Sequence, residues 1–171
     1  MRTIKKAVSA ILIFTVLMVF AGCSTSFSKI EKDDMVKACE QYFQWKEGDN
    51  YEVRQDYTLS MKKTDDSNEE ISYDLQWYLV GLGLTEDAPK AYLTYYVFAS
   101  DKDAKDYWSL KINQGNSYQA CLYYISADSA DHFKGIYCVG NMYFVIEGLE
   151  EDGVKAVKDL LTSFGYPAEK K

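Results

Sequence analysis

Histidine and proline are scarce in this 171-residue sequence, and both shortages narrow the functions that it can have. His132 is the only histidine, so a metal site built from several imidazoles is excluded. Pro89 and Pro167 are the only prolines, and no Pro-rich tract, low-complexity stretch or block of like charge divides the chain. The apolar stretch at residues 7–20 has 14 residues, whereas crossing a bilayer takes about 20. A permanent membrane-spanning helix is therefore disfavoured.

Sequence patterns for several common catalytic and cofactor sites are missing as well. No GxSxG nucleophile motif occurs, and residues 81–83 (Gly-Leu-Gly) lack the third glycine of a dinucleotide-binding loop. Asp101, Asp103 and Asp106 suggest a calcium loop, but that loop needs Gly at its sixth place and Glu at its twelfth, where Asp106 and Ile112 stand. We therefore expect no catalytic residue, no metal site and no cofactor.

His132 lies in a polar segment together with Asp128 and Asp131. One interpretation pairs the imidazole with one of these carboxylates as an acid–base or metal-binding element. The other treats the segment as a polar loop between two strands, and we favour it because a metal site needs three or four converging ligands. Two carboxylates can still meet in space as they do in glycosidases, which keeps a cell-envelope hydrolase open as an alternative function.

An export signal is present at the amino terminus. Residues 1–6 include three basic residues and no acid, residues 7–20 are apolar apart from a serine and a threonine, and small residues follow up to Cys23. These three regions are typical of a signal peptide. The stretch Phe20-Ala21-Gly22-Cys23 resembles the lipobox of bacterial lipoproteins, with Phe20 where a leucine is usual, and the resemblance implies cleavage before Cys23 and lipidation of its thiol. The alternatives are an ordinary secretory signal or an uncleaved anchor, in which Cys23 is incidental.

Three parts of the chain follow from this interpretation: a lipoprotein signal peptide at residues 1–22, a lipidated Cys23 with a short tether at residues 23–29, and a single domain at residues 30–171. Cleavage removes three basic residues and no acid, which takes the formal net charge from −7 to −10. Such a charge repels nucleic acid and anionic lipid heads, so we expect no nucleic-acid partner. The lipid must then provide the contact with the membrane.

The hydrophobic pattern predicts an α+β domain. Helices are indicated near residues 35–43, 100–111 and 150–164, and strands at residues 51–62, 71–79, 91–99, 118–126, 133–139 and 142–147. Within residues 51–61 and 71–79 the apolar side chains alternate, so we expect each strand to bury one continuous face. Gly140-Asn141 predicts a two-residue hairpin of type II′. Antiparallel hairpins then form a sheet of five or six strands with the helices packed on one face, a two-layer sandwich.

The other three cysteines are assigned structural roles. Cys39 lies on the apolar face of the first predicted helix and is expected to be buried. Cys121 and Cys138 lie in two strands joined by a short loop, and they face each other if that hairpin is centred between Ser129 and Ala130. A disulfide between them is one alternative, since an exported domain can keep such a bond; two unlinked thiols are the other.

The carboxyl-terminal half resembles a broad group of small surface lipoproteins from Gram-positive bacteria whose function is uncharacterised. The resemblance is carried by the start of the second helix at residues 100–108, by the hairpin at residues 140–146 and by the end of the last helix, Phe164-Gly165-Tyr166. These motifs are structural rather than catalytic. The resemblance implies a location on the outer face of the cell membrane and names no activity.

Together these features favour a membrane-anchored extracytoplasmic lipoprotein that works as a non-enzymatic binding or accessory module. Its expected partners are the membrane, through the lipid, and an envelope protein or a cell-wall component. The alternatives are a hydrolase that uses paired carboxylates and a subunit that positions a membrane complex. The 15 tyrosines indicate a tyrosine-rich sheet surface, and a ligand-stacking platform is the alternative interpretation of the same residues.

Overall fold

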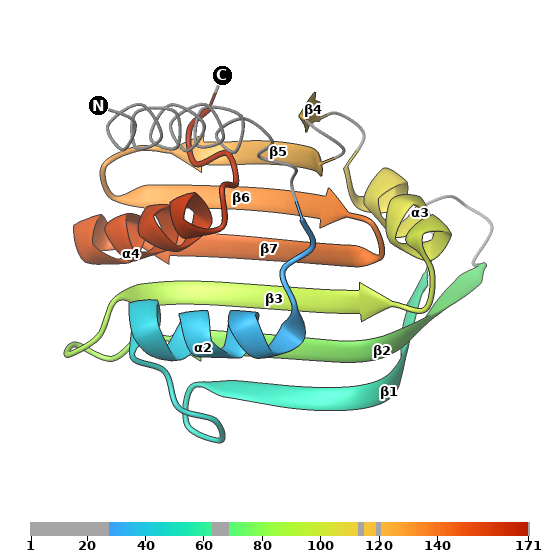
Figure 1. The fold of residues 1–171 in the computed structure, drawn as a ribbon, viewed down its shortest axis with the longest axis horizontal. Coiled ribbons are helices and arrows are strands. Elements are labelled where there is room, and N and C mark those ends of the chain that lie inside the picture. Colours follow the sequence, from blue (N-terminus) through green and yellow to red (C-terminus); the bar gives the residue numbers. More distant parts are fainter. Residues whose placement is uncertain (1–27, 63–68, 113–114, 119–120, 171) are drawn as a thin grey trace, which may run out of the picture.

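The computed structural model describes residues 28–62, 69–112, 115–118 and 121–170. In chain order they form α2 (Lys32–Phe43), β1 (Tyr51–Lys62), β2 (Glu70–Gly83), β3 (Lys90–Phe98), α3 (Asp101–Lys111), β4 (Asn116–Tyr118), β5 (Cys121–Asp128), β6 (His132–Val139), β7 (Met142–Leu149) and α4 (Glu150–Ser163). The seven strands form one antiparallel sheet of order β1-β2-β3-β7-β6-β5-β4 (Figure 1). The predicted α+β class with an antiparallel sheet is confirmed. The seventh strand is β4, which pairs with β5 as a short edge strand of its own.

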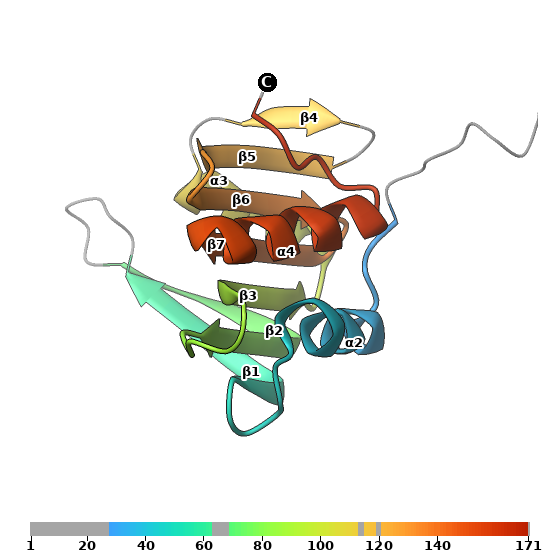
Figure 2. The same ribbon diagram turned by 90° about the vertical axis from the view of Figure 1, so that its left-hand side faces the viewer.

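The three helices lie on both faces of the sheet. α2 and α4 pack over one face, on a core to which Leu93, Tyr95 and Phe144 contribute. α3 packs on the opposite face, where its Tyr107 and Trp108 meet the other set of alternating strand residues (Figure 2). The expected packing on one face is therefore confirmed for α2 and α4 but not for α3. Helical periodicity shows that α3 has a buried side, but the face of the sheet that it covers depends on how the chain turns after β3.

A paired irregularity in β1 and β2 reverses which side chains face which layer. Asp56 has a φ of 49°, and the pairing of β2 with β3 shifts register at Gln76. Trp77 consequently belongs to the core under α2 and α4, whereas Leu75 belongs to the core under α3. Our expectation of one continuous buried face along each of these strands is wrong, because a bulge inserts one residue and moves all later side chains to the other face. β1 likewise contributes its first half to one core and its second half to the other.

Trp45 sets the end of α2 and the length of β2. The helix ends at Phe43, and Trp45 then turns onto β2 with only 2% of its surface exposed. A Cβ built on Gly81 or Gly83 would lie 2.2 Å or 2.1 Å from the indole, so only glycine leaves room for this ring. β2 therefore continues through Gly83, beyond the predicted end of this strand at residue 79.

Local motifs fix the start of α3 and the turn between β6 and β7, and the turn forms as predicted. The Ser100 hydroxyl accepts a hydrogen bond of 3.1 Å from the Asp103 amide and caps α3. Gly140-Asn141 connects β6 and β7 as a two-residue turn, with a positive φ at Gly140, as a type II′ turn requires. The Asn141 side chain donates a hydrogen bond of 2.7 Å to the Phe98 carbonyl and ties this turn to the end of β3.

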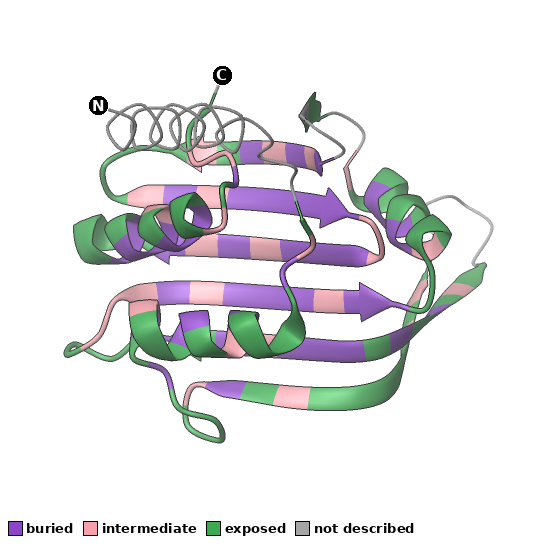
Figure 3. Cartoon of the chain, viewed as in Figure 1, coloured by how far each residue is buried: buried purple, intermediate pink, exposed green. Residues whose placement is uncertain are grey.

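Burial is highest in the middle of the sheet and falls toward the β1 edge (Figure 3). β3, β6 and β7 carry mostly buried residues, whereas most of β1 is exposed or half-buried. Of the helices within the described ranges, none has the length and hydrophobicity needed to cross a bilayer. The folded part of the chain is therefore held together by two cores, one on each face of the central strands.

Candidate functional site

The face of the sheet opposite α2 and α4 is covered by α3 over only part of its area. We call this surface the open face. It is formed by alternate residues of the strands, which are buried or half-buried below α3 and become more accessible away from it: Tyr57, Tyr78, Val80, Leu82, Tyr92, Thr94, Tyr96, Tyr124, Ile136 and Val145. Leu82 and Tyr57 are its most exposed apolar residues, at 50% and 39%. The predicted tyrosine-rich sheet surface is present here.

The tyrosines of the open face contact one another across the strands. The ring centroids of Tyr57 and Tyr78 lie 5.0 Å apart and those of Tyr78 and Tyr96 lie 6.2 Å apart, both edge to face. The Arg54 guanidinium lies over the Tyr78 ring at 6.0 Å, and the Tyr92 hydroxyl accepts a hydrogen bond of 2.5 Å from Thr94. Such a row offers apolar rings with polar tips, which can stack on a partner and also bond to it.

The hydroxyls of Tyr78 and Tyr96 stay protonated at neutral pH. Burial raises the pKa of Tyr96 to about 12, and it raises the pKa of Tyr78 above its ordinary value despite the opposing charge of Arg54. A protonated phenol both donates and accepts a hydrogen bond, whereas a phenolate would only accept. Tyr78 and Tyr96 therefore present uncharged hydrogen-bonding groups on the open face.

A charged cluster lies on the same face at the end of β6 and β7 remote from α3. Glu147 Oε1 lies 2.7 Å from His132 Nε2, and Glu147 Oε2 lies 2.8 Å from Lys134 Nζ. The alternative that pairs His132 with Asp128 or Asp131 is wrong, because the ring turns to Glu147 across the strands. Asp128 instead accepts a hydrogen bond of 2.6 Å from the Lys158 ammonium group of α4.

Ser129 does not form a catalytic triad with this histidine. Its hydroxyl lies 2.7 Å from Asp131 Oδ1 and accepts a hydrogen bond of 3.1 Å from the backbone amide of His132. These contacts close the polar turn between β5 and β6, which supports the favoured interpretation of the segment as a loop.

One lysine and one histidine around a single carboxylate make the pH response of Glu147 predictable. Burial raises its pKa, but the hydrogen bonds and charges of Lys134 and His132 outweigh burial and leave the pKa below the ordinary value. The stabilisation is then complete above the pKa of an unfolded glutamate, about 4.3, and is lost as pH falls through the lower folded value.

We expect Glu147→Gln to lower the free energy of unfolding at pH 7 by no more than about 1 kcal/mol, because the partners are partly exposed. The difference from the unmodified protein should shrink as the pH falls below about 4. Urea unfolding at pH 7, 5 and 3.5 measures both effects. A difference that grows on acidification would contradict the assignment, and Glu70→Gln in β2 is the control for removing an exposed acid.

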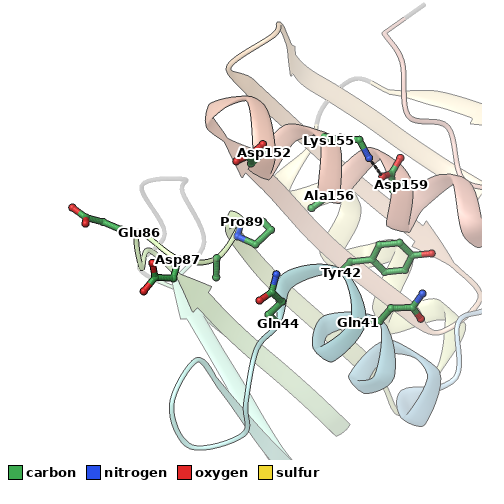
Figure 4. Close-up of a pocket in the computed structure, with 11 residues that line it drawn as sticks. Gln41, Tyr42, Gln44, Glu86, Asp87, Pro89, Asp152, Lys155, Ala156 and Asp159 are labelled. Carbon is green, nitrogen blue, oxygen red and sulfur yellow. Dashed lines mark hydrogen bonds and ion pairs between the residues drawn. The ribbon is translucent and has the colours of Figure 1, made fainter.

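An acidic groove lies on the other side of the sheet, between α2, α4 and the loop that joins β2 to β3 (Figure 4). Its volume is about 420 Å³. Asp152, Lys155 and Asp159 enter from α4 and Asp87 from the loop, while Glu86 extends away from the groove. Lys155 and Asp159 pair with each other at 2.6 Å, so one of the carboxylates already has a cation. The groove is wide and open, unlike the enclosed cleft in which a glycosidase holds its sugar.

A smaller hollow lies beside the bulge in β1 and β2. Its volume is about 290 Å³, and its lining includes Asp56, Thr58, Asp74 and Gln76. The Thr58 hydroxyl donates a hydrogen bond of 3.1 Å to Asp74. Within the described part of the chain, no group of three or more His, Cys, Asp or Glu side chains is arranged to hold a metal ion.

The cysteines of the folded domain are buried thiols. β5 pairs with β6 so that Cys121 faces Val139 and Leu122 faces Cys138, one residue away from the register that a Cys121–Cys138 disulfide requires. The two thiols therefore lie on opposite faces of the sheet and are free. Burial raises the pKa of Cys121 to about 12 and that of Cys138 to about 11. Cys39 is also free and fully buried, and burial raises the pKa of its thiol strongly.

Sequence reasoning located the lipidation candidate but not the surface that the domain presents. Cys23 lies outside the described residues. A tyrosine-rich sheet surface was predicted without its location, because its tyrosines come from β1, β2, β3 and β5, and alternation within a strand does not tell which of two buried faces is left uncovered. Comparison of the chain with protein-family models, with curated proteins and with solved structures found no match.

Proposed function

We propose that the chain is a lipid-anchored extracytoplasmic module, attached through Cys23 to the outer face of a Gram-positive cell membrane, that binds a protein partner and catalyses no reaction. The signal peptide, the resemblance to a lipobox and the small polar residues after Cys23 support the anchor. The folded domain begins within a few residues of that cysteine, since Ile30 is already buried in the core.

The observation that carries the binding proposal is the partly uncovered, tyrosine-lined open face. Aromatic residues with polar tips are the side chains that protein interfaces favour, and exposed apolar surface on a folded domain marks interaction sites. The mature chain has a net charge of −10, so a basic partner would be attracted over a distance and an anionic cell-wall polymer repelled. We therefore assign to the open face a protein partner with a basic surface.

The state of the nucleophilic side chains supports a non-enzymatic role. The thiols of Cys39, Cys121 and Cys138 are buried and protonated, and a protonated thiol is a weak nucleophile. The Ser129 hydroxyl is held by the turn that contains it. The His132 ring is held by the Glu147 carboxylate of the neighbouring strand, at 2.7 Å from Nε2 to Oε1.

Photo-crosslinking in native membranes tests the partner. A photoreactive residue replacing Leu82 on the open face should give a discrete protein adduct that weakens as salt is raised, since steering by charge is screened. The same residue at Lys37 on α2 is the matched control and should give no such adduct. Absence of a protein adduct at Leu82 would sink the proposal, and so would hydrolysis of a cell-wall glycan by the purified chain. An adduct with an integral membrane protein would favour the role of a subunit that positions a membrane complex.

A further inference from the structure

The start of the folded chain is fixed on the side of the sheet that α2 and α4 cover. The Ser28 carbonyl accepts a hydrogen bond of 3.1 Å from the Tyr166 hydroxyl, and the Ile30 carbonyl accepts one of 2.6 Å from the Tyr95 hydroxyl. Both tyrosines belong to the core beneath these two helices. The chain thus enters the domain through the helix layer, which we define as α2 and α4, and not through the open face (Figure 2).

The covalent path from Cys23 to Ser28 is short. Its five peptide units span at most about 17 Å when fully extended. Ser28 is bonded to Tyr166, whose ring packs on Tyr137 of β6. To reach the open face from there, the tether would have to pass around β5 and β4, which takes about 10 Å at ordinary strand spacing. It would then have to cross the thickness of a layer, about another 10 Å, so the whole path exceeds the reach of the tether.

The alternative path around the other edge is longer still, because β7, β3, β2 and β1 lie on that side of β6. A lipid on Cys23 can therefore reach the bilayer easily only when the helix layer is turned toward it. Charge does not supply this orientation, since α2 and α4 together carry seven acidic and four basic side chains. The orientation is set by tether length rather than by electrostatic attraction.

We propose that the anchored domain is held with α2 and α4 toward the phospholipid surface and with α3 and the open face directed away from it. This inference rests on the lipid anchor proposed above. It makes the open face the side that a partner in the envelope meets first, and it places the acidic groove between α2 and α4 on the membrane side.

Fluorescence quenching of the lipidated chain tests the orientation. Single cysteines for a fluorophore are introduced at exposed positions, Thr162→Cys in α4 and Lys37→Cys in α2 for the helix layer, Lys105→Cys in α3 and Glu52→Cys in β1 for the opposite side. The native thiols Cys39, Cys121 and Cys138 are buried and do not compete for the label. The protein is reconstituted in phosphatidylcholine–phosphatidylglycerol vesicles that contain lipids with a nitroxide on the head group.

We expect the dyes on the helix layer to be quenched about twofold or more over those on α3 and β1, because the layers lie about 10 Å apart. Inserting a Gly/Ser-rich segment of about 20 residues before Ser28 should remove the difference, since such a segment reaches about 25 Å on average. Equal or reversed quenching in the unextended, vesicle-bound protein would overturn the orientation alone. Failure of the chain to bind vesicles, with no lipid on Cys23 by mass spectrometry, would overturn the anchor instead.

Discussion

Cys23→Ala should move the protein from the membrane fraction to the soluble fraction of the cell or to the medium. Each methylene group of an acyl chain that enters the bilayer contributes about 0.8 kcal/mol, and stable anchoring takes more than one chain. A chain without the thiol has no site for the diacylglyceryl group. The acidic domain has no compensating attraction for anionic lipid heads, so the loss of membrane association should be nearly complete.

Membrane fractionation, followed by mass spectrometry of the mature amino terminus, measures this outcome. The matched control is Cys138→Ala, which removes a buried thiol of the folded domain and should leave the protein on the membrane. An unmodified Cys23 in an uncleaved, membrane-retained chain would contradict the anchor. So would a Cys23→Ala variant that stays in the membrane fraction through a high-salt wash.

Gly153→Ala should destabilise the domain, although alanine is the better helix former. Gly153 lies in the first turns of α4, where a Cβ would stand 2.1 Å from the Lys90 carbonyl oxygen of β3. Gly148 of β7 makes the same approach from the other side, since its Cβ would stand 2.5 Å from the Gly153 carbonyl oxygen. The contacts are with backbone, which cannot swing away as a flexible side chain can, so α4 must move off the sheet.

Helix propensity and the close backbone contact predict changes in stability of opposite sign for Gly153→Ala, so the measured sign decides between them. Helix propensity alone favours alanine over glycine by about 1 kcal/mol, whereas overpacking a close contact costs about 1–3 kcal/mol or more. We expect a net loss of about 2 kcal/mol in the free energy of unfolding, which lowers the melting temperature of a domain of this size by about 4–8 °C.

Urea and thermal unfolding of the mature chain measure the effect of Gly153→Ala. Thr162→Ala, at an exposed position of the same helix, is the control and should leave stability unchanged or slightly higher. A Gly153→Ala variant as stable as the unmodified protein would mean that α4 lies farther from β3 and β7 than the structure has it.

Gly140, compared with Gly148 and Gly153, shows which parts of the fold can be predicted from neighbouring residues. Gly140 is required by a two-residue turn, and the dipeptide with Asn141 predicts that turn without knowledge of any distant residue. Ser100 likewise predicts the start of α3 through its own hydroxyl. Gly153 is required by the backbone of β3, more than sixty positions away, and no local pattern indicates that approach.

The same distinction between local and long-range information applies to Cys23 and the open face. The anchor proposed at Cys23 rests on its immediate neighbours alone, because a lipobox is a short segment of sequence and contains the information by itself. The open face depends on pairing between distant strands, and a single residue decides it: the bulge at Asp56 sends Tyr57 to the face of α3, opposite to Gln55. The Cys121–Cys138 disulfide, one of the two alternatives from the sequence, is likewise prevented by a single residue, since the register between β5 and β6 is shifted by one from the register that the bond needs.

By itself the sequence determined every helix and strand except β4, the antiparallel α+β class, the β6–β7 turn and the expectation of an anchor at Cys23. These depend on neighbours within a few positions and on the repeat of hydrophobic residues. The tertiary structure alone decided the strand order, the placement of α3 apart from α2 and α4, the separation of Cys121 from Cys138, and which tyrosines remain accessible. The reason is that side chains alternate with a period of two, so register and bulges, set by packing between distant strands, decide the face on which each side chain lies.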